Sequence, residues 1–366
     1  MSYVWNPSEE ADIASFMDNN TYLSYYDSNN DTLLCGSDST QDFRRYFLPP
    51  FYFLIFLLGL CGNVMVIAVL LRAKESLPGT DVFILHLAVA DVLLVLTLPF
   101  WAVQAMHSWV FGDVMCKIVG SVFKINFYAS IFFLVCISFD RYLSIVYVIR
   151  MYNRGGRSSL IFLSSLAVWA LCILLTLPDF IYLTSEPDSR QNTTSCTLNF
   201  PPGSSSAKFF IRIFSQLLAF FLPLVAMTFC YIRIILSLVN SKGSKKNKAF
   251  RVIFAVVVVF FLCWTPYHLV EFIETLIDFN ALQKDCEWEA KLDMAETVTT
   301  SLGFFHCCLN PLLYAFVGIK FQNRFLDLLE SFGCVSHAFL QRHARSSSHR
   351  RDSTWSESTE ASYSGL

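Results

Sequence analysis

An acid and a base stand side by side in the stretch LVCISFDRYLSIV, residues 134–146, which is otherwise free of charge. Charged side chains at membrane depth are costly and therefore mark candidates for function. Asp140 can neutralise the guanidinium of Arg141 while this end of a helix is closed, and movement of a neighbouring helix would expose Arg141 to a partner. The pair therefore predicts a conformational switch. The alternative is an ion pair that only anchors the helix end.

A second acid, Asp91, lies within the apolar stretch LHLAVADVLL. In a helical bundle the small polar residues Asn63, Ser130 and Asn310 are candidates to lie beside it. A carboxylate with several oxygen neighbours can hold a sodium ion, whereas in a dry site it would be protonated. We predict ion binding at Asp91, Ser130 and Asn310, and we expect no other cofactor. The alternative is an acid that only makes structural hydrogen bonds.

Other side chains with catalytic or metal-binding chemistry form no comparable group. His306, Cys307 and Cys308 are adjacent, but no second group of ligands accompanies them, so we expect no metal site. The patterns His-Glu-x-x-His and Gly-x-Ser-x-Gly do not occur, and no intramembrane acids are paired, so we do not expect an enzyme. A transporter would show internal repeats with matching broken helices, which are not seen either. We expect no nucleic-acid partner.

The elements that would position these residues are apolar enough for a membrane. Charged residues make up 15% and hydrophobic residues 54% of the 366 residues, against about 25% charged in soluble domains. Six windows without Asp, Glu, Lys or Arg approach the roughly 20 residues that cross a bilayer, and a seventh is shorter but extends on both sides. The windows are 46–71, 92–112, 125–139, 158–178, 213–232, 252–270 and 297–319.

These windows predict an all-α membrane protein with a seven-transmembrane helix bundle at residues 46–319. The stretch KFQNRFLDLLESFGC predicts a short amphipathic eighth helix beside the membrane, at residues 320–333. Cys334 at its end is a candidate for palmitoylation, with an unmodified thiol as the alternative. Residues 1–45 and 334–366 are predicted to be disordered tails.

Lysine and arginine in the short loops set the orientation, because they accumulate on the cytoplasmic side. They are more numerous after the first, third and fifth windows than after the second, fourth and sixth. We therefore predict a multi-pass protein of the plasma membrane with an extracellular N-terminus and a cytoplasmic C-terminus. Three glycosylation sequons, at Asn19, Asn30 and Asn192, fall on the predicted extracellular side.

Both tails have a composition that suits binding partners. The N-terminal tail is acidic, and Tyr25 and Tyr26 stand beside Asp27, so it can dock a basic partner. A solvated spacer is the alternative. The C-terminal sequence SSSHRRDSTWSESTEASYSGL predicts a kinase substrate whose phosphates would attract a basic partner. A tail that only aids solubility is the alternative there.

Four of the twelve cysteines lie in predicted extracellular segments, namely Cys35, Cys116, Cys196 and Cys286. An even number of cysteines in an oxidising compartment predicts two disulfides. Four cysteines allow three connectivities, and the spacing alone does not choose among them.

Short motifs occur in order along the chain, one in each predicted span, and each alone is a weak signal. They are Gly62-Asn63, LAVAD ending at Asp91, Asp140-Arg141-Tyr142, Trp169, Pro223 with Tyr231, CWTP at 263–266 and NPLLY at 310–314. Together they resemble the rhodopsin-like family of G-protein-coupled receptors over residues 46–333.

The resemblance implies activation of a heterotrimeric G protein, of the inhibitory class. In that family, the arginine matching Arg141 contacts the G protein, and tyrosines matching Tyr231 and Tyr314 move in beside it. The signalling switch implied for this chain comprises Asp140, Arg141, Tyr142, Tyr231, Trp264, Pro266, Asn310, Pro311 and Tyr314. Receptor kinases and arrestin are the partners implied for the C-terminal tail. The oligomeric state, as a homo- or hetero-oligomer, is left open.

Narrower features resemble the chemokine receptors and, among them, the CXC class. Phe123 stands where amine receptors carry an aspartate, and residues 294–319 contain no internal lysine for retinal. The stretch TLPFWAV, residues 97–103, is similar to the Thr-x-Pro kink and following tryptophan of chemokine receptors. CXC chemokines are therefore the implied ligands, and leukocyte chemotaxis is the implied output.

The resemblance also implies two disulfides, Cys116–Cys196 and Cys35–Cys286, and a ligand that binds in two steps. The acidic tail, sulfated at Tyr25 and Tyr26 beside Asp27, would hold the basic core of a chemokine. The flexible N-terminus of the chemokine would then enter the bundle. The pocket residues implied are Trp101, Phe123, Asp179, Tyr267, Glu274, Asp293 and Glu296.

Two departures from the family pattern keep alternatives open. Thr300 stands where many chemokine receptors carry a glutamate, so another acid must receive the ammonium group of the ligand. The usual Ala-Ile-Val-His after Asp-Arg-Tyr-Leu reads Ser-Ile-Val-Tyr at 144–147, which would alter the loop contact with the G protein. The alternatives are a chemokine-scavenging decoy receptor and a receptor for another basic peptide. The intact Asp-Arg-Tyr argues against the decoy.

Overall fold

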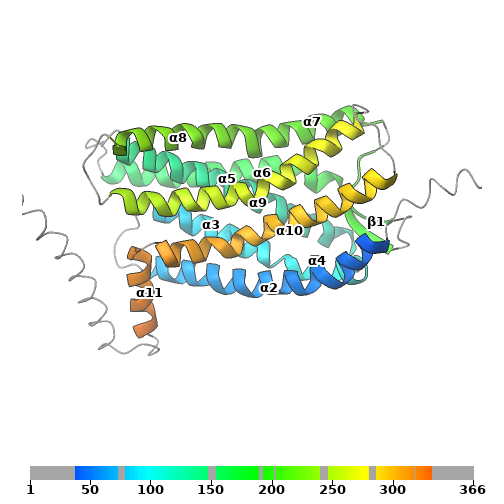
Figure 1. The fold of residues 1–366 in the computed structure, drawn as a ribbon, viewed down its shortest axis with the longest axis horizontal. Helices are drawn as coiled ribbons and strands as arrows, with labels where there is room; N and C mark the ends of the chain where they lie inside the picture. The colour runs from blue at the N-terminus through cyan, green and yellow to red at the C-terminus, as the bar shows by residue number, and fades with distance from the viewer. Residues whose placement is uncertain are drawn as a thin grey trace, which may run out of the picture.

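The computed structural model describes residues 38–72, 79–146, 154–188, 193–201, 203–239, 246–279, 286–317 and 319–331. The long helices run side by side in one bundle, with a β-hairpin at one end and helix α11 at the other (Figure 1). We call these the hairpin end and the α11 end. The elements are α2 Asp38–Leu71, α3 Gly79–Val95, α4 Leu98–Met106, α5 Gly112–Val146, α6 Arg154–Tyr182, β1 Leu183–Asp188, β2 Thr193–Leu198, α7 Ser205–Gln216, the π-helical segment η1 Leu217–Phe221, α8 Leu222–Val239, α9 Lys246–Asp278, α10 Cys286–Val317 and α11 Ile319–Ser331.

Among the described residues, six helical stretches are long and apolar enough to cross a membrane. They are Gln41–Leu71, Gly79–Met106, Gly112–Val146, Ser159–Tyr182, Ser205–Val239 and Ile253–Asp278. Helix α10 completes the seven-helix bundle that the sequence predicts. Its first turns carry acids and a lysine, and it is free of charge from Thr297 to its end at Val317.

The second span begins earlier than the charge-free window at 92–112 predicted. Helix α3 begins at Gly79 and contains two acids, Asp81 in its first turn and Asp91 near its end. The search for windows without any Asp, Glu, Lys or Arg therefore made this predicted span too short at its N-terminal end. Asp91 has no exposed surface, so this helix buries its charge within the bundle instead of against lipid.

A kink divides this span into α3 and α4. Pro99 has no backbone N–H and cannot close a helical hydrogen bond to the carbonyl of Val95. At the kink, the hydroxyl and the backbone N–H of Thr97 both donate to the carbonyl of Leu94, at 2.7 and 2.8 Å. Helix α4 then carries Trp101, whose ring centroid lies 5.7 Å from that of Trp109.

Both ends of the bundle are tied by polar contacts. Helix α2 begins at Asp38, so the segment predicted as a tail, 1–45, is helical in its last eight residues. There Arg44 donates through Nε to the hydroxyl of Thr297 at 2.9 Å. At the other end, the predicted amphipathic helix is present as α11, which lies across the bundle (Figure 1). Its Arg324 pairs with Asp81 at 3.0 Å.

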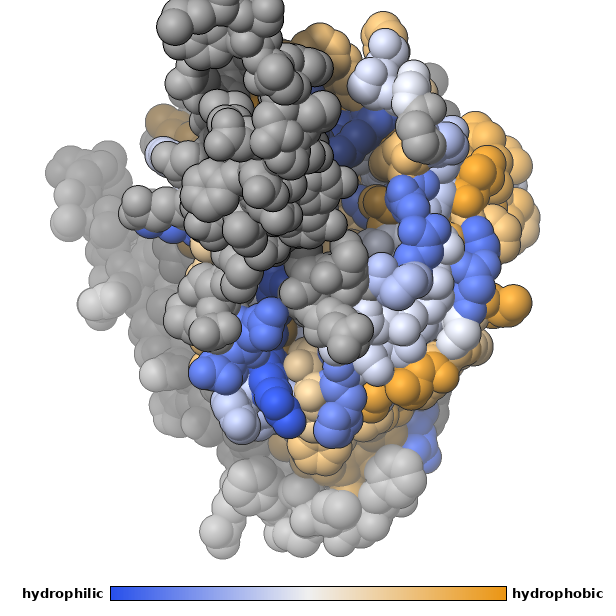
Figure 2. Space-filling model, turned by 90° about the vertical axis from the view of Figure 1, so that its right-hand side faces the viewer, coloured by the Kyte–Doolittle hydropathy of each residue, from blue (hydrophilic) through white to orange (hydrophobic). Residues whose placement is uncertain are grey.

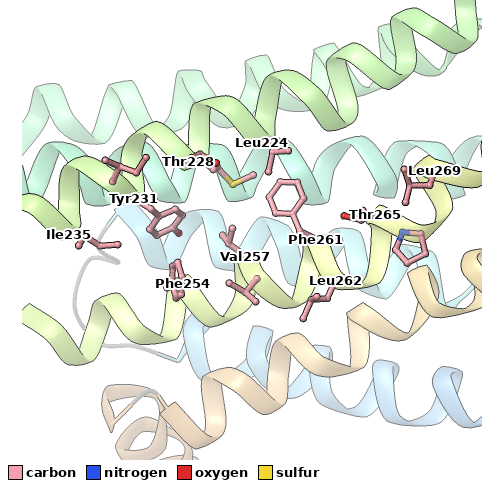
Figure 3. A pocket seen from close by; sticks show the side chains of 14 residues that line it. Leu224, Thr228, Tyr231, Ile235, Phe254, Val257, Phe261, Leu262, Thr265 and Leu269 are labelled. Atoms are coloured by element: carbon pink, nitrogen blue, oxygen red, sulfur yellow. The ribbon is translucent and has the colours of Figure 1, made fainter. Parts of the chain in front are cut away.

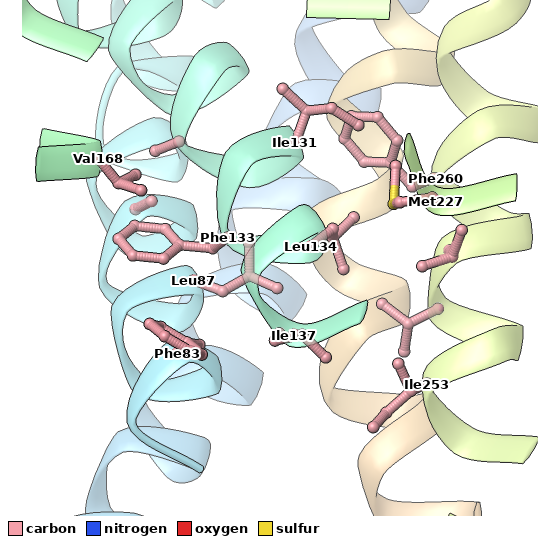
Figure 4. Close-up of a cluster of buried hydrophobic side chains, with 14 of the residues drawn as sticks. Phe83, Leu87, Ile131, Phe133, Leu134, Ile137, Val168, Met227, Ile253 and Phe260 are labelled. Carbon is pink, nitrogen blue, oxygen red and sulfur yellow. The ribbon is translucent and has the colours of Figure 1, made fainter. Parts of the chain in front are cut away.

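The core lies between α3, α5, α6, α8 and α9 (Figure 4). Adjacent residues of α5 point about 100° apart around that helix: Phe133 is directed to Phe83, and Leu134 to Met227 and Ile253. All five are buried. Because lipid is as apolar as these side chains, close packing rather than removal from water stabilises such a bundle.

The hairpin covers one end of the bundle and is covalently fixed there. Strands β1 and β2 pair antiparallel, with Ser185 opposite Cys196. Cys196 forms a disulfide with Cys116 in the second turn of α5, which confirms one of the two predicted pairs. Cys35 and the side chain of Cys286 lie outside the described residues, so the second pair stays a prediction.

Candidate functional site

Trp264 of α9 is the centre of an aromatic cluster halfway along the bundle. Its side chain is fully buried. The ring centroids of Phe127 and His306 lie 4.8 and 5.6 Å from that of Trp264, and the ring of Phe123 lies 6.5 Å away. Helix α10 can approach the indole because residue 303 is a glycine. The cluster therefore joins α5, α9 and α10 through one side chain.

The cluster continues toward the hairpin end through predicted pocket residues. The ring of Tyr267 is buried and lies 5.6 Å from that of Trp264 and 6.2 Å from that of Phe127. Phe123 contacts Phe304 of α10 edge to face at 5.3 Å. Phe123 and Phe127 are four residues apart in α5, so they face the same side of that helix. The structure thus brings Phe123 and Tyr267 into one aromatic cluster.

Asp179, also predicted to contact ligand, pairs with a lysine that was not predicted. The Nζ of Lys124 lies 3.8 Å from Oδ1 of Asp179, and the two side chains are only 13% and 10% exposed. Asp179 is therefore not a free acid in this structure. The signal for Lys124 was available, because a lysine inside a predicted span is costly and needs a partner.

A polar chain runs beside this ion pair from α7 to α9. His268 Nδ1 lies 2.9 Å from Oε1 of Gln216, and Nε2 of Gln216 donates to Oε2 of Glu271 at 2.9 Å. Gln216 and His268 are both buried. None of the three was predicted: Gln216 and His268 are neutral polar residues within apolar windows and give no charge signal, and Glu271 directly follows the window 252–270. The chain fixes the carboxylate of Glu271 on the wall between the helices.

The acids predicted nearer the hairpin end differ in their partners. Glu274 lies 3.8 Å from Arg212. Asp278, one turn further, pairs with Arg212 at 3.1 Å and with Lys208 at 2.7 Å. Figure 2 looks onto this end, and in the part not drawn in grey it shows hydrophilic residues with hydrophobic residues at the sides. The face is therefore polar with both signs of charge, and α7 and α9 are tied there by ion pairs.

The two predicted acids of α10 lie on the same side of the bundle as Arg44. The guanidinium of Arg44 donates to the backbone carbonyl of Asp293 at 3.1 Å. Glu296 is exposed, and its side chain makes no ion pair with any residue in the described part of the chain. Glu296 is therefore an acid that a ligand can reach.

Below Trp264, Asp91 is the centre of a buried polar layer. Its Oδ2 accepts from Nδ2 of Asn310 at 2.9 Å, and its Oδ1 accepts from Nδ2 of Asn126 at 3.3 Å. His306 Nε2 lies 3.7 Å from Oδ1. The contact with Asn310 was predicted, whereas Asn126 and His306 were missed. Their signal was spacing, since Asn126 precedes the predicted Ser130 by one helical turn.

Asn63, which was also expected beside Asp91, does something else. Its Nδ2 donates to the carbonyls of Gly59 and Cys307 at 2.9 and 3.0 Å and so ties α2 to α10. A second close contact lies one turn along, where a Cβ at Gly62 would be 2.9 Å from Cγ of Pro311. The two contacts hold the α11-directed half of α10 against α2.

The donor set around Asp91 fits a small hard cation. The hydroxyl of Ser130 and Oδ1 of Asn126 are buried and have no hydrogen-bond partner among the described residues. Both are oxygens, which hard cations prefer as ligands, and Asn126 contacts Asp91 through its Nδ2. Buried polar atoms without partners are costly, so a bound cation would satisfy a need already present in the fold.

At the α11 end, Asp140 has a partner that was not predicted. The hydroxyl of Thr80 in α3 donates to Oδ2 of Asp140 at 2.6 Å. Arg141 is half-buried, and its Nε is buried without a hydrogen-bond partner in the described part of the chain. The predicted pairing of Asp140 with Arg141 stays a prediction. The guanidinium is thus held close to the bundle and is not fully solvated.

The predicted switch tyrosines pack around this end. The ring of Tyr142 contacts Phe229 of α8 at 5.7 Å. The hydroxyl of Tyr231 lies 3.1 Å from that of Ser138 in α5, and its ring contacts Phe254 of α9 edge to face at 5.4 Å. Tyr231 therefore bridges α5, α8 and α9. The side chain of Tyr314 lies outside the described residues.

A groove of about 630 Å³ lies between α8 and α9 (Figure 3). Tyr231 and Phe254 line its end toward α11, and Pro266 and Leu269 line the opposite end. No ionisable group other than the tyrosine hydroxyl lines it. The two helices are therefore not packed together along this stretch, and Pro266 gives α9 a site at which it can bend.

The remaining predicted residues lie outside the described part of the chain. They are Asn19, Tyr25, Tyr26, Asp27, Asn30 and Asn192. The described residues combine an acidic and aromatic wall near the hairpin end, a buried polar layer below it and an arginine at the α11 end. The acids can receive a cationic group, and the groove beside Pro266 gives α9 room to bend.

Comparison with known proteins gives a consistent set of relatives. The profile of the family described as 7 transmembrane receptor (rhodopsin family) matches residues 62–314. C-X-C chemokine receptor type 3 of Homo sapiens is 49% identical over 362 residues, which cover 98% of this chain and 97% of the relative. The receptor of the same description from Capra hircus is 51% identical over 332 residues, or 91% and 89% of the two chains.

A further relative belongs to another chemokine class. C-C chemokine receptor type 4 of Homo sapiens is 39% identical over 326 residues, which cover 89% of each chain. In the sequence, HCCLNPLLYAFVG and the tail SSSHRRDSTWSESTEASYSGL predict a likeness to C-X-C chemokine receptor type 3 in particular. That prediction is confirmed, since identity to this receptor is higher than to the C-C receptor.

Proposed function

Because the chain belongs to the rhodopsin family of seven-transmembrane receptors, and within it to the chemokine receptors, we propose that it binds CXC chemokines and activates G proteins of the inhibitory class. It is a receptor and not an enzyme. In this proposal it lies in the plasma membrane of a leukocyte, with the hairpin end outside and the α11 end inside. Its output is chemotaxis.

One observation carries the proposal: a continuous series of contacts runs from the pocket wall toward the α11 end. Phe123 contacts Trp264, and Trp264 contacts His306, with ring centroids 6.5 and 5.6 Å apart. His306 lies 3.7 Å from Asp91, which accepts a hydrogen bond from Asn310. A ligand that displaces Phe123 therefore acts on the aromatic cluster and on the buried polar layer together.

The arrangement at the α11 end supports a switch that opens toward a G protein. Tyr231 and Phe254 form a contact between α8 and α9 at this end, and the groove beyond them leaves the rest of this stretch of α9 without close packing against α8. If α9 bends at Pro266 and moves outward, Arg141 becomes accessible from the α11 end. The G protein then stabilises this state by binding it selectively.

Ligand recognition is proposed to occur in two steps. The tail residues Tyr25, Tyr26 and Asp27, with the tyrosines sulfated, hold the basic core of the chemokine. The N-terminus of the chemokine then reaches the wall formed by Trp101, Phe123 and the nearby acids. Replacement of both tyrosines by phenylalanine should weaken binding, and an unchanged affinity would remove the tail from the mechanism.

A sodium ion is proposed at Asp91, with Ser130 and Asn126 as further oxygen ligands. When bound, it supplies a positive charge that balances the carboxylate inside the bundle. The C-terminal tail is proposed to be phosphorylated by receptor kinases and to recruit arrestin, because phosphates on its many hydroxyls create an anionic strip. Glycans are proposed at Asn19, Asn30 and Asn192.

The test is a panel of CXC and CC chemokines on cells that express the chain, with cAMP suppression and arrestin recruitment measured in parallel. Suppression by some CXC chemokines supports the proposal. Uptake of chemokine or arrestin recruitment without suppression would show a decoy. A response to a basic peptide other than a chemokine, with no chemokine response, would place the ligand in another class.

A further inference from the structure

Lys124 pairs with Asp179, an acid that the proposed function assigns to the ligand. Its Nζ lies 3.8 Å from Oδ1 of Asp179, and both side chains are almost fully buried. A lysine and an aspartate buried in a membrane protein each need a partner, because an isolated charge there is costly. Each residue satisfies the other without any ligand.

Two aromatic rings fix the ammonium group of Lys124 further. Its Nζ lies 5.7 Å from the ring centroid of Phe127 and 6.0 Å from that of Phe123, which is the range of a cation–π contact. These rings are also the ones that contact Trp264, with centroids 4.8 and 6.5 Å apart. The lysine therefore already holds a cation against two rings of the aromatic cluster.

We propose that the Lys124 ammonium is a built-in occupant of the acidic site at Asp179, and that the terminal ammonium of the ligand is received instead by Glu296 on α10. Asp179 is then a positioning residue for Lys124, not a ligand contact. Lys124 in turn is a specificity determinant, because it closes the deep acid to cationic ligands. This inference rests on the proposed function for the identity of the ligand.

The preference follows from charge and tethering. A ligand cation at Asp179 would have to displace the ammonium of Lys124. Because Lys124 is part of the chain, it pairs with Asp179 without the loss of translational and rotational freedom that a separate ligand incurs. The displaced Lys124 would also be left buried without its acid. Glu296 is exposed and has no cation within ion-pair distance among the described residues, although Arg44 and Arg212 attract its carboxylate, whereas Glu274 faces Arg212 at 3.8 Å. An exposed acid without an ion-pair partner is thus available in Glu296, whereas the buried Asp179 is already paired.

The ion pair is tested first on the purified full chain without ligand, by thermal unfolding. Lys124→Met and Asp179→Asn should each lower the unfolding temperature, and the double variant should lower it by less than the sum of the two. A matched pair on the same helix is the control. Lys117 and Asp113 lie 3.9 Å apart but are 25% and 50% exposed, so Lys117→Met and Asp113→Asn should be nearly additive. Additive effects at Lys124 and Asp179 as well would overturn the pair.

The ligand contact is tested with a CXC chemokine and the same chemokine acetylated at its N-terminus, which removes the terminal charge. Acetylation should weaken binding to the wild type, by about tenfold for a contact of ordinary strength. Acetylation should weaken binding to Asp179→Asn by the same factor, and it should leave binding to Glu296→Gln unchanged. Loss of the acetylation effect in Asp179→Asn, with its retention in Glu296→Gln, would overturn the inference.

The two tests separate this inference from the proposed function. If the wild type binds no chemokine, the proposed function is wrong and Glu296 loses its ligand, while unfolding still decides whether Lys124 and Asp179 act as a pair. If chemokine binds and the unfolding effects are additive, the function stands and the built-in cation does not.

Discussion

Gly303 of α10 lies so close to Trp264 that a Cβ at position 303 would be 2.9 Å from Cζ3 of the indole ring. Two further ring atoms would lie 3.0 and 3.1 Å away. Because the indole has no exposed surface, it cannot yield by turning into solvent. The glycine therefore sets the distance between α9 and α10 at the point where the aromatic cluster meets the polar layer.

The first prediction is that Gly303→Ala destabilises the receptor by about 1–3 kcal/mol, the usual cost of overpacking a core. It should also change basal G-protein activation, because the indole must shift. The measurements are thermal unfolding of the purified chain and basal cAMP in cells. Trp264→Phe in the same background is the control, since the smaller ring makes room for the methyl group. Equal destabilisation with and without Trp264→Phe would show that the indole is not the cause.

Arg141 gives the second prediction. Arg141→Ala should abolish cAMP suppression and leave chemokine binding at the cell surface unchanged, because the guanidinium lies at the α11 end, away from the pocket wall. Arg233→Ala is the matched control: it removes an exposed arginine of α8 and should leave suppression intact. Full suppression by Arg141→Ala would remove this residue from the switch.

The disulfide gives the third prediction. Cys116 and Cys196 are 80 residues apart in sequence, so their bond closes a long loop and constrains the unfolded chain strongly. Replacing both by alanine should cost about 2–5 kcal/mol and lower the amount of receptor at the surface. Cys172→Ala, at a buried free cysteine of α6, is the control for loss of a small side chain. Flow cytometry of intact cells measures the difference, and equal loss in both variants would contradict the structural role of the disulfide.

The helices could be predicted from the sequence because charge is so costly in lipid that its absence marks each span. The same rule failed where charge is buried within the bundle. It cut the second span short at Asp91, and it treated Lys124 only as a break in the third window. Both residues lie inside the bundle with protein partners, so a span can carry a charge that never meets lipid.

The site could be predicted only in part, because neutral polar residues leave no mark in an apolar window. Asp91 and Asn310 belong to recognisable motifs, and the structure brings the two side chains into hydrogen-bond contact. Asn126 and His306 complete the same layer, yet only their spacing on α5 and α10 connects them to it. Such partners depend on how the helices pack, which composition does not determine.

The last prediction concerns the sodium ion proposed at Asp91. Such an ion between α3, α5 and α10 would stabilise the arrangement described here, in which Arg141 is half-buried. By linkage, an agonist that favours an open α11 end should bind more weakly when sodium is present. Replacing sodium by choline at constant ionic strength should therefore raise agonist affinity, by about fivefold or more.

Asp91→Asn should remove this dependence on sodium, since the neutral amide cannot balance a cation. Asp81→Asn is the control, because Asp81 lies on the same helix but pairs with Arg324 at the α11 end. Ser130→Ala should weaken the dependence without abolishing it, because it deletes one oxygen ligand and keeps the carboxylate. If Asp91→Asn and the wild type responded alike to sodium, no cation would act through this carboxylate. The buried oxygens of Ser130 and Asn126 would then need another partner, such as bound water.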